Sequence, residues 1–330
     1  MSVTLRYVPR TAGVSVKTVS RVVNNQGEIS EETRQRIKSV VREMGYRPNL
    51  VARGLVTQRT RTIGLIVPDI TNPFFPEVAK GVQDACRLQD YNVYLCNSGE
   101  SQQEELRALN SLAAQGVDGI IISPCYLAND CLSSFAEQFR PLVTINHDFE
   151  HLNIGRVMTD NFHGAQLAIR YLLDKGHHKI GMIAGVEQSP LRGRRLGGYC
   201  NVMQAHNLEL AIEHVKTLQP NIESGILAAQ ALLSAHPDLT AIFAYNDMVA
   251  LGILQACRQS GRQLPQDCAI IGFDDIQVAA LSSPALTTIR LDKHKIGEVA
   301  VQQMFEMINS PQKAVEAVQL AVELVVRQSA

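Results

Sequence analysis

Apolar residues recur along most of the chain as short uninterrupted runs, and a longer segment with helical spacing follows each run. The seven clearest runs read TIGLIVP, NVYLCN, DGIIIS, PLVTIN, KIGMIAG, TAIFAY and CAIIGF. Because they are apolar throughout and do not alternate, they predict strands of parallel sheets that helices cover on both faces. Seven or more such strands exceed one compact sheet. The pattern from Thr62 onward therefore predicts two doubly wound α/β lobes in series.

The chain before Thr62 shows short helical patterns and no strand candidate. Gly13 permits a tight turn after a first helix, and Ser15 is a favourable N-cap for a second. A third helix is expected to start after Ser30 and to stop at Gly45. The second helix would bury an apolar stripe, formed by Val16, Val19, Val22 and Val23. This spacing of turn, cap and stripe predicts a helix-turn-helix.

Charge is distributed unevenly along the 330 residues, although the net charge is only −1. Residues 1–62 carry 12 Lys and Arg against 4 Asp and Glu, whereas the remainder carries 19 against 28. A basic segment on an acidic body favours a polyanionic partner for that segment, and a solvated charged face is the alternative.

Composition indicates a soluble protein of the cytoplasm. The chain is 45% hydrophobic and 19% charged, and no run of 18 apolar residues suggests a membrane span. The first residues lack the apolar core of a secretory signal. Seven cysteines without a CxxC pair are predicted to be reduced, buried thiols.

Three strings, AGVSVKTVSRVVN, GYRPNLVARGL and TIGLIVPDITNPFF, resemble the lactose, galactose and ribose repressor (LacI/GalR) family over essentially the whole chain. The resemblance implies an N-terminal all-α helix-turn-helix domain joined to an α/β periplasmic-binding-protein-like domain of two doubly wound parallel-sheet lobes. It also implies a DNA-binding transcriptional regulator, most commonly a repressor, whose operator affinity a small metabolite controls. The expected boundaries are 1–47 for the helix-turn-helix, 48–61 for a hinge helix and linker, 62–160 with 291–320 for the first lobe, and 161–290 with 321–330 for the second.

In this family the second helix enters the major groove, so the resemblance implies which residues meet DNA. Base edges would face Val16, Lys17 and Arg21, and Arg21 is the candidate for a bidentate contact to guanine. Phosphates would be held by Thr18 and Ser20. The remaining DNA candidates are Asn24 and, wedged into the minor groove from the hinge, Leu55. Exposed helix charges and an ordinary connector are the alternatives.

Pro9 departs from the family pattern, because the first helix normally begins near Thr4 and runs unbroken. A proline in a helix interior costs about 3 kcal/mol. We therefore expect this helix either to begin late or to be distorted.

Ligands of open α/β sheets bind beyond the carboxyl ends of the strands, where this chain carries amides, carboxylates and aromatic rings. The effector candidates are Asn72, Phe74, Phe75, Asn146, His147, Arg195, Asn246 and Asp274. Alternatives remain: Asn72 could cap the helix that follows it, Asp247 could cap the next helix, and Phe74 could belong to the core of its lobe. Pro220 stands where relatives often carry an aromatic ring. A ribose- or hexose-sized sugar is the first expectation, followed by a nucleobase or nucleoside and then a phosphosugar.

Signatures of catalysis are missing: there is no GxGxxG after a strand, no GxxxxGK[ST], no GxSxG and no HExxH. We therefore expect no enzyme, no cofactor and no metal site. A solute-binding protein without DNA function would explain the lobes but not the first 61 residues. A near-palindromic operator and a homodimer are expected, because two recognition helices must reach successive turns of DNA and no leucine heptads follow the last strand-like stretch.

Overall fold

The computed structural model describes residues 7–23, 27–45, 59–147, 149, 151, 154–187, 189–214, 219–310 and 315–330. Contacts divide the chain into a first unit, residues 1–60, and a second unit, residues 61–330. Among the described residues, none of the helices combines the length and the apolar character needed to span a membrane.

The described residues of the first unit form three helices around a small core: α1 (Tyr7–Ala12), α2 (Val16–Val23) and α3 (Glu31–Glu43). The Ser15 hydroxyl accepts a hydrogen bond from the Thr18 N–H at 3.1 Å, so the predicted cap at the start of α2 is present. Gly13 adopts a left-handed φ of 64° in the turn between α1 and α2. The core consists of Val8, Ala12, Val19, Val22 and Ile37.

Val16 is exposed and Pro9 is buried in this unit. Val16 is 49% exposed and does not join the buried stripe, so its assignment to the core was wrong. It is the first residue of α2, before the helix face that packs on α1 and α3 begins. Pro9 is buried inside α1, and its carbonyl accepts from the Val14 N–H. The expected late start of this helix concerns residues 1–6, which lie outside the described part of the chain.

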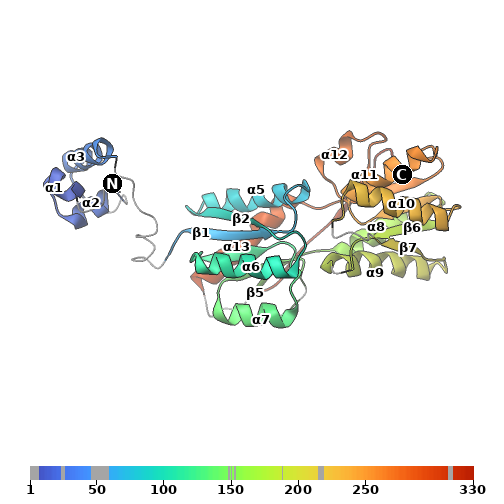
Figure 1. Ribbon diagram of the computed structural model, residues 1–330, viewed down its shortest axis with the longest axis horizontal. Helices are drawn as coiled ribbons and strands as arrows, with labels where there is room; N and C mark the ends of the chain where they lie inside the picture. Colours follow the sequence, from blue (N-terminus) through green and yellow to red (C-terminus); the bar gives the residue numbers. More distant parts are fainter. Residues whose placement is uncertain are drawn as a thin grey trace. The chain divides into compact units, whose positions relative to one another are not determined.

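The first lobe of the second unit is built on a six-stranded sheet in which every neighbouring pair is parallel, with strand order β11-β5-β4-β3-β1-β2. The strands are β1 (Thr62–Val67), β2 (Asn92–Asn97), β3 (Gly119–Ile122), β4 (Leu142–Ile145), β5 (Ile154–Thr159) and β11 (Val318–Leu320). The helices around it are α5 (Phe74–Arg87), α6 (Gln102–Ala114), α7 (Asn129–Gln138) and α13 (Lys293–Asn309) (Figure 1).

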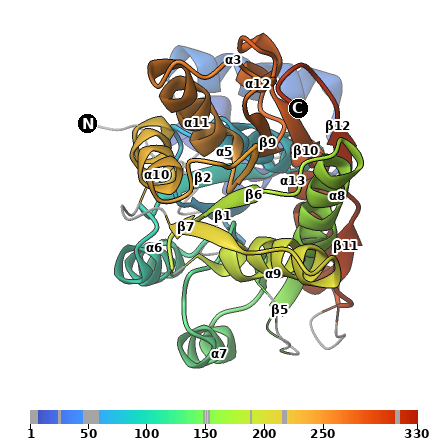
Figure 2. The same ribbon diagram turned by 90° about the vertical axis from the view of Figure 1, so that its right-hand side faces the viewer.

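The second lobe repeats the arrangement with strand order β12-β10-β9-β8-β6-β7, except that β12 runs antiparallel to β10. Its strands are β6 (Ile180–Ala184), β7 (Ala211–His214), β8 (Ala241–Ala244), β9 (Ala269–Asp274), β10 (Thr287–Arg290) and β12 (Glu323–Val325). Its helices are α8 (Asn161–Asp174), α9 (Pro190–Ala205), α10 (Ile222–Ala235), α11 (Asp247–Gln259) and α12 (Gln277–Leu281) (Figure 2).

The chain crosses between the lobes three times: from β5 to α8, from β10 to α13, and from β11 to β12. All seven apolar runs are strands, and the predicted fold class is confirmed. One detail of the pattern was wrong, because β2 is an edge strand whose Tyr94 and Leu95 are half exposed instead of covered. The carboxyl ends of β1–β4 and of β8–β9 lead into the pocket described below.

Helices α5 and α13 pack closely because glycines face each other between them. A Cβ atom at Gly81 would lie 2.1 Å from the carbonyl oxygen of His294, and one at Gly297 would lie 2.4 Å from the carbonyl oxygen of Val78. Helix α13 begins with Lys293 directly after the crossing from β10, and Phe74, the first residue of α5, lines the pocket described below. This packing fixes the positions of the side chains that the first turns of these helices carry.

Candidate functional site

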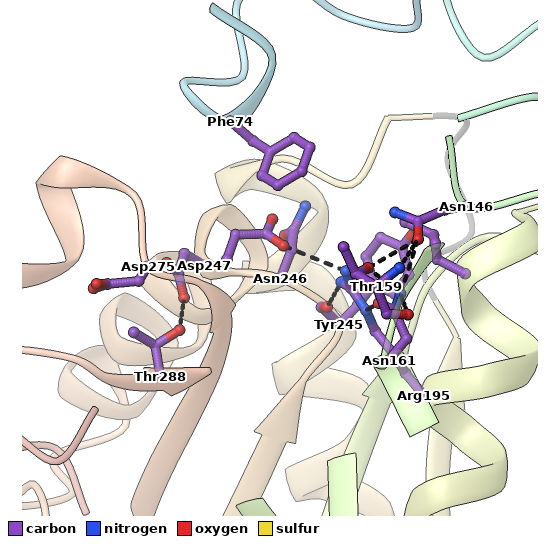
Figure 3. Close-up of polar contacts among 12 residues, drawn as sticks. Phe74, Asn146, Thr159, Asn161, Arg195, Tyr245, Asn246, Asp247, Asp275 and Thr288 are labelled. Atoms are coloured by element: carbon purple, nitrogen blue, oxygen red, sulfur yellow. Dashed lines mark hydrogen bonds and ion pairs between the residues drawn. The ribbon is translucent and has the colours of Figure 1, made fainter. Parts of the chain in front are cut away.

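A pocket between the two lobes collects side chains that follow the carboxyl ends of the strands. Seven of the eight predicted effector residues line it: Asn72, Phe74, Phe75, Asn146, Arg195, Asn246 and Asp274. The other lining residues are Glu100, Ser123, Pro124, Tyr126, Leu191, Pro220 and Tyr245. Figure 3 shows part of this cluster and its hydrogen bonds.

His147 does not line the pocket. Its imidazole Nε2 lies 3.0 Å from the Asn129 side-chain oxygen at the start of α7, away from the other candidates. The preceding residue, Asn146, has a left-handed φ of 57°, and this turn in the backbone separates the directions of the two side chains. The structure therefore gives no support to His147 as an effector contact.

Among the described residues that line the pocket, Arg195 on α9 is the only basic one, and it is 2% exposed. Its Nε donates to the Asn161 side-chain oxygen at 2.9 Å, its Nη1 donates to the Tyr245 carbonyl, and its Nη2 lies 3.3 Å from an oxygen of Asp274. The guanidinium also covers the Phe273 ring, 3.8 Å from its centroid. Its charge is thus already compensated within the second lobe (Figure 3).

Asp274 ends β9 and is buried, with a φ of 115° that places its carboxylate toward Arg195. Burial raises the pKa of this carboxyl to about 6, against the opposing effect of Arg195 and Lys293. The ammonium of Lys293, at the start of α13, donates to the carbonyls of Asp274 and Asp275 at 2.9 and 2.8 Å. It also lies 3.6 Å from the carboxylate of Glu77 on α5.

The amides of the pocket are held by local hydrogen bonds. The Asn146 oxygen accepts from the N–H and the hydroxyl of Thr159, both at 2.8 Å. Asn246 caps α11 by accepting from the Val249 N–H at 2.9 Å, and Asn72 accepts from the Phe74 N–H at 3.1 Å. These bonds fix the orientation of each amide. Asn72 does not cap α5, because Pro73 occupies the N-cap position, and its hydrogen bond to Phe74 lies in the turn before the helix.

Asp247 does not cap α11, because Asn246 occupies that position. Its buried carboxyl accepts from the Thr288 hydroxyl at 2.6 Å and from the Ile276 N–H at 2.8 Å (Figure 3). Burial and the nearby Asp274 carboxylate raise its pKa well above the usual range. Asp247 therefore links β10 and the turn after β9 to α11. These hydrogen bonds hold the end of β9, where Asp274 lies.

Four lining residues with polar side chains were not predicted: Glu100, Ser123, Tyr126 and Tyr245. The Tyr245 hydroxyl lies 2.6 Å from the Ser189 hydroxyl, which orients the ring. With Phe74 and Phe75, the tyrosines provide aromatic surface in a pocket where Pro220 replaces the expected ring. Each of the four follows or ends a strand, so the position after the strand was the available signal.

Several DNA candidates are exposed on α2. Val16, Lys17 and Arg21 are exposed, whereas Thr18 and Ser20 are half-buried. The Thr18 hydroxyl lies 2.8 Å from that of Ser15. The other two candidates, Asn24 and Leu55, lie outside the described residues. Among the residues that the structure describes, no three His, Cys, Asp or Glu side chains gather closely enough to hold a metal ion.

Two family models match the chain. Residues 4–49 match the bacterial regulatory proteins of the lacI family, and residues 60–328 match the periplasmic binding proteins and sugar-binding domain of the LacI family. The ribose operon repressor of Haemophilus influenzae is 34% identical over 331 residues, 99% of this chain and 98% of that protein.

Solved structures agree with this. The lac repressor dimer bound to operator and the anti-inducer ONPF is 25% identical, with a TM-score of 0.90 over 100% of this chain and 99% of that one. A LacI-family transcriptional regulator from Enterococcus faecium with bound ribose is 29% identical, with a TM-score of 0.73 over 82% of this chain and 98% of that one.

Proposed function

Because the chain belongs to the lacI family of bacterial regulatory proteins, we propose that it is a transcriptional repressor whose affinity for operator DNA is set by a neutral sugar in the pocket between its lobes. The observation that carries the proposal is the buried Arg195–Asp274 pair, placed with amides and aromatic rings in a pocket lined by both lobes. Paired polar groups bind hydroxyls, and aromatic rings cover the apolar face of a sugar. The family consists of transcriptional regulators.

The charges of the pocket favour a neutral ligand over a phosphosugar. Arg195 is already paired with Asp274, and Glu100 adds a second carboxyl among the lining residues. A phosphate would need a cation that is not compensated, and it would be repelled by an ionised Glu100. The tyrosine and phenylalanine rings also suit a planar nucleobase, which is the second candidate.

The DNA-binding half rests on α2, which exposes Lys17 and Arg21 together. A repressor with one such helix in each subunit of a homodimer would bind a near-palindromic operator. The lac repressor of the comparison is itself a dimer on its operator. We infer the same assembly for this chain.

Lys293 provides a route from ligand to lobe movement. It holds the backbone of Asp274 and Asp275 in the second lobe, and it lies beside Glu77 of the first. A ligand that moves Asp274 therefore also acts on the start of α5 and α13. A shift of one lobe against the other is the kind of two-state change that couples distant sites.

The experiment combines a ligand screen with DNA binding. Thermal unfolding of the protein is measured with D-ribose, D-glucose, D-ribose 5-phosphate, hypoxanthine and adenosine, and an operator is selected from a random duplex pool. We expect a neutral sugar to raise Tm and to change operator affinity, and Asp274→Ala to lose both effects while it still binds operator. Asp238→Ala, at an exposed ion pair with Lys179, is the matched control. Failure to prefer any duplex sequence would contradict the proposal.

A further inference from the structure

Two polar side chains lie on the first-lobe side of the pocket, apart from the Arg195–Asp274 pair. Glu100 follows β2 and Ser123 follows β3, the two strands on either side of β1. Their positions after parallel strands place them at the same edge of the sheet, and both line the pocket. No sequence motif assigned either residue.

Both side chains carry a buried oxygen that has no hydrogen-bond partner among the residues that the structure describes. These atoms are Oε2 of Glu100 and Oγ of Ser123, and Ser123 is only 1% exposed. Buried polar atoms in native proteins are almost always paired, so such an atom at a pocket wall calls for an explanation. A ligand group that fills the pocket would supply the missing partner.

Glu105 shows what a purely structural carboxylate looks like in the same region. It is fully buried, and its two oxygens accept from the Tyr126 N–H at 3.1 and 3.0 Å. Hydrogen bonds within the protein satisfy both oxygens of Glu105, and they anchor the segment after β3. Glu100 differs from Glu105, because its Oε2 has no hydrogen-bond partner among the described residues.

The structure holds Glu100 in place. Its side chain is hydrogen-bonded to the Tyr126 side chain. Its backbone has a left-handed φ of 60°, and the preceding Gly99 has a φ of 61°. A non-glycine residue in that region has a conformational cost and is common at functional sites. Burial and the neighbouring Asp69 raise the pKa of Glu100 to about 7, against the Tyr126 hydrogen bond, so the carboxyl is partly ionised near neutral pH and accepts as a carboxylate above that pH.

We propose that Glu100 and Ser123 form an acceptor subsite on the first lobe that binds hydroxyl groups of the effector, while Arg195 and Asp274 bind it from the second lobe. This subsite rests on the proposed function, and it specifies which chemical groups of the effector face the first lobe. A hydroxyl can donate to Glu100 and both donate to and accept from Ser123. A phosphate can only accept at physiological charge, so Glu100 selects against phosphorylated sugars. The effector would then link the two lobes directly.

Isothermal titration of the full chain tests the subsite with D-ribose, D-glucose and D-ribose 5-phosphate as probes. The variants are Glu100→Gln and Ser123→Ala, and Glu104→Gln is the control, because Glu104 is exposed on α6 beside Arg107. The neutral sugar that binds the unmodified chain should bind Glu100→Gln about tenfold more weakly, as expected for a lost bond to a charged acceptor. Ser123→Ala should weaken it several-fold, and Glu104→Gln should not. D-ribose 5-phosphate should bind Glu100→Gln no more weakly than the unmodified chain.

The outcomes separate the two proposals. If Asp274→Ala abolishes sugar binding while Glu100→Gln and Ser123→Ala bind the sugar like the unmodified chain, the subsite is overturned and the proposed function stands. If neither neutral sugar binds the unmodified chain at millimolar concentration, both are overturned. Circular dichroism confirms that each variant is folded. If Glu100→Gln does not fold, Ser123→Ala still tests the proposed subsite independently.

Discussion

Gly81→Ala tests the close contact between α5 and α13. The new methyl group would lie 2.1 Å from the His294 carbonyl oxygen and 2.9 Å from the carbonyl carbon. Both atoms belong to the backbone, so no change of rotamer relieves the clash. The added methyl group and the carbonyl oxygen must separate by more than about 1 Å to reach ordinary van der Waals contact. Gly297 meets the backbone of Val78 and Val82 just as closely from the other side, which leaves no alternative packing nearby.

The expected destabilisation follows from two opposing contributions. Overpacking in a close-packed interior costs about 1 to 3 kcal/mol, and a backbone clash of this depth belongs at the upper end. Alanine regains up to about 1 kcal/mol of helix propensity relative to glycine. The net loss is therefore about 2 kcal/mol, which corresponds to a decrease in Tm of about 5 °C for a unit of this size.

Far-UV circular dichroism is the suitable assay, because the chain contains no tryptophan. Gly193→Ala is the matched control: Gly193 is exposed on α9, and no atom lies within 4 Å of its added methyl group. This control should keep or raise Tm, since only the propensity gain remains. The reasoning is refuted if Gly81→Ala melts at or above the temperature of the unmodified protein.

Three further predictions concern DNA binding, coupling and pH. Arg21→Ala should reduce the ratio of operator to random-duplex affinity about tenfold or more, because a bidentate guanine contact is worth about 1 to 3 kcal/mol; an unchanged ratio in fluorescence anisotropy would argue against the contact. Lys293→Met should leave sugar binding measurable but shrink the effect of sugar on operator affinity, since the link from Asp274 to Glu77 is removed; an undiminished effect would exclude Lys293 from the coupling. The pKa of Glu100 is raised from 4.5 to about 7 by burial, so its protonated form stabilises the fold at low pH, and this contribution is lost as pH rises from about 4.5 to 7. Urea unfolding at pH 5 and pH 8 should show a smaller decline for Glu100→Gln than for the unmodified chain, and equal declines would mean that Glu100 is not buried as described.

The seven apolar runs predicted six interior strands and the edge strand β2, whereas the edge strands β7 and β11 were not among them, for a physical reason. Strands such as β1 and β9 are buried on both faces, so they must be continuously apolar. Strands at the sheet edges are less fully covered, so they need not be continuously apolar. Strand β7 contains Glu213 and His214, and β11 has only three residues. Their places in the sheets depend on tertiary pairing, which local patterns do not encode.

The pocket residues show the same division. Motif resemblance led to Arg195 and Asp274, and both lie in the pocket. The rule that polar residues after strands form the site could not separate Asn146, which lines the pocket, from His147, which does not. Glu100 and Ser123 also follow strands, but the rule could not single them out, because their unpaired oxygens become visible only when the burial of each atom is known.

Strands β11 and β12 have a consequence for synthesis on the ribosome. They follow the other described strands in sequence, yet they pair with β5 in one lobe and with β10 in the other. Neither sheet can be completed until residues 318–325 have left the exit tunnel, and until then β5 and β10 expose unpaired backbone at the edges of the nascent chain. The two lobes therefore mature nearly together, once residues 318–325 have been synthesised, and nascent chains that lack these residues would present two open sheet edges to chaperones and proteases.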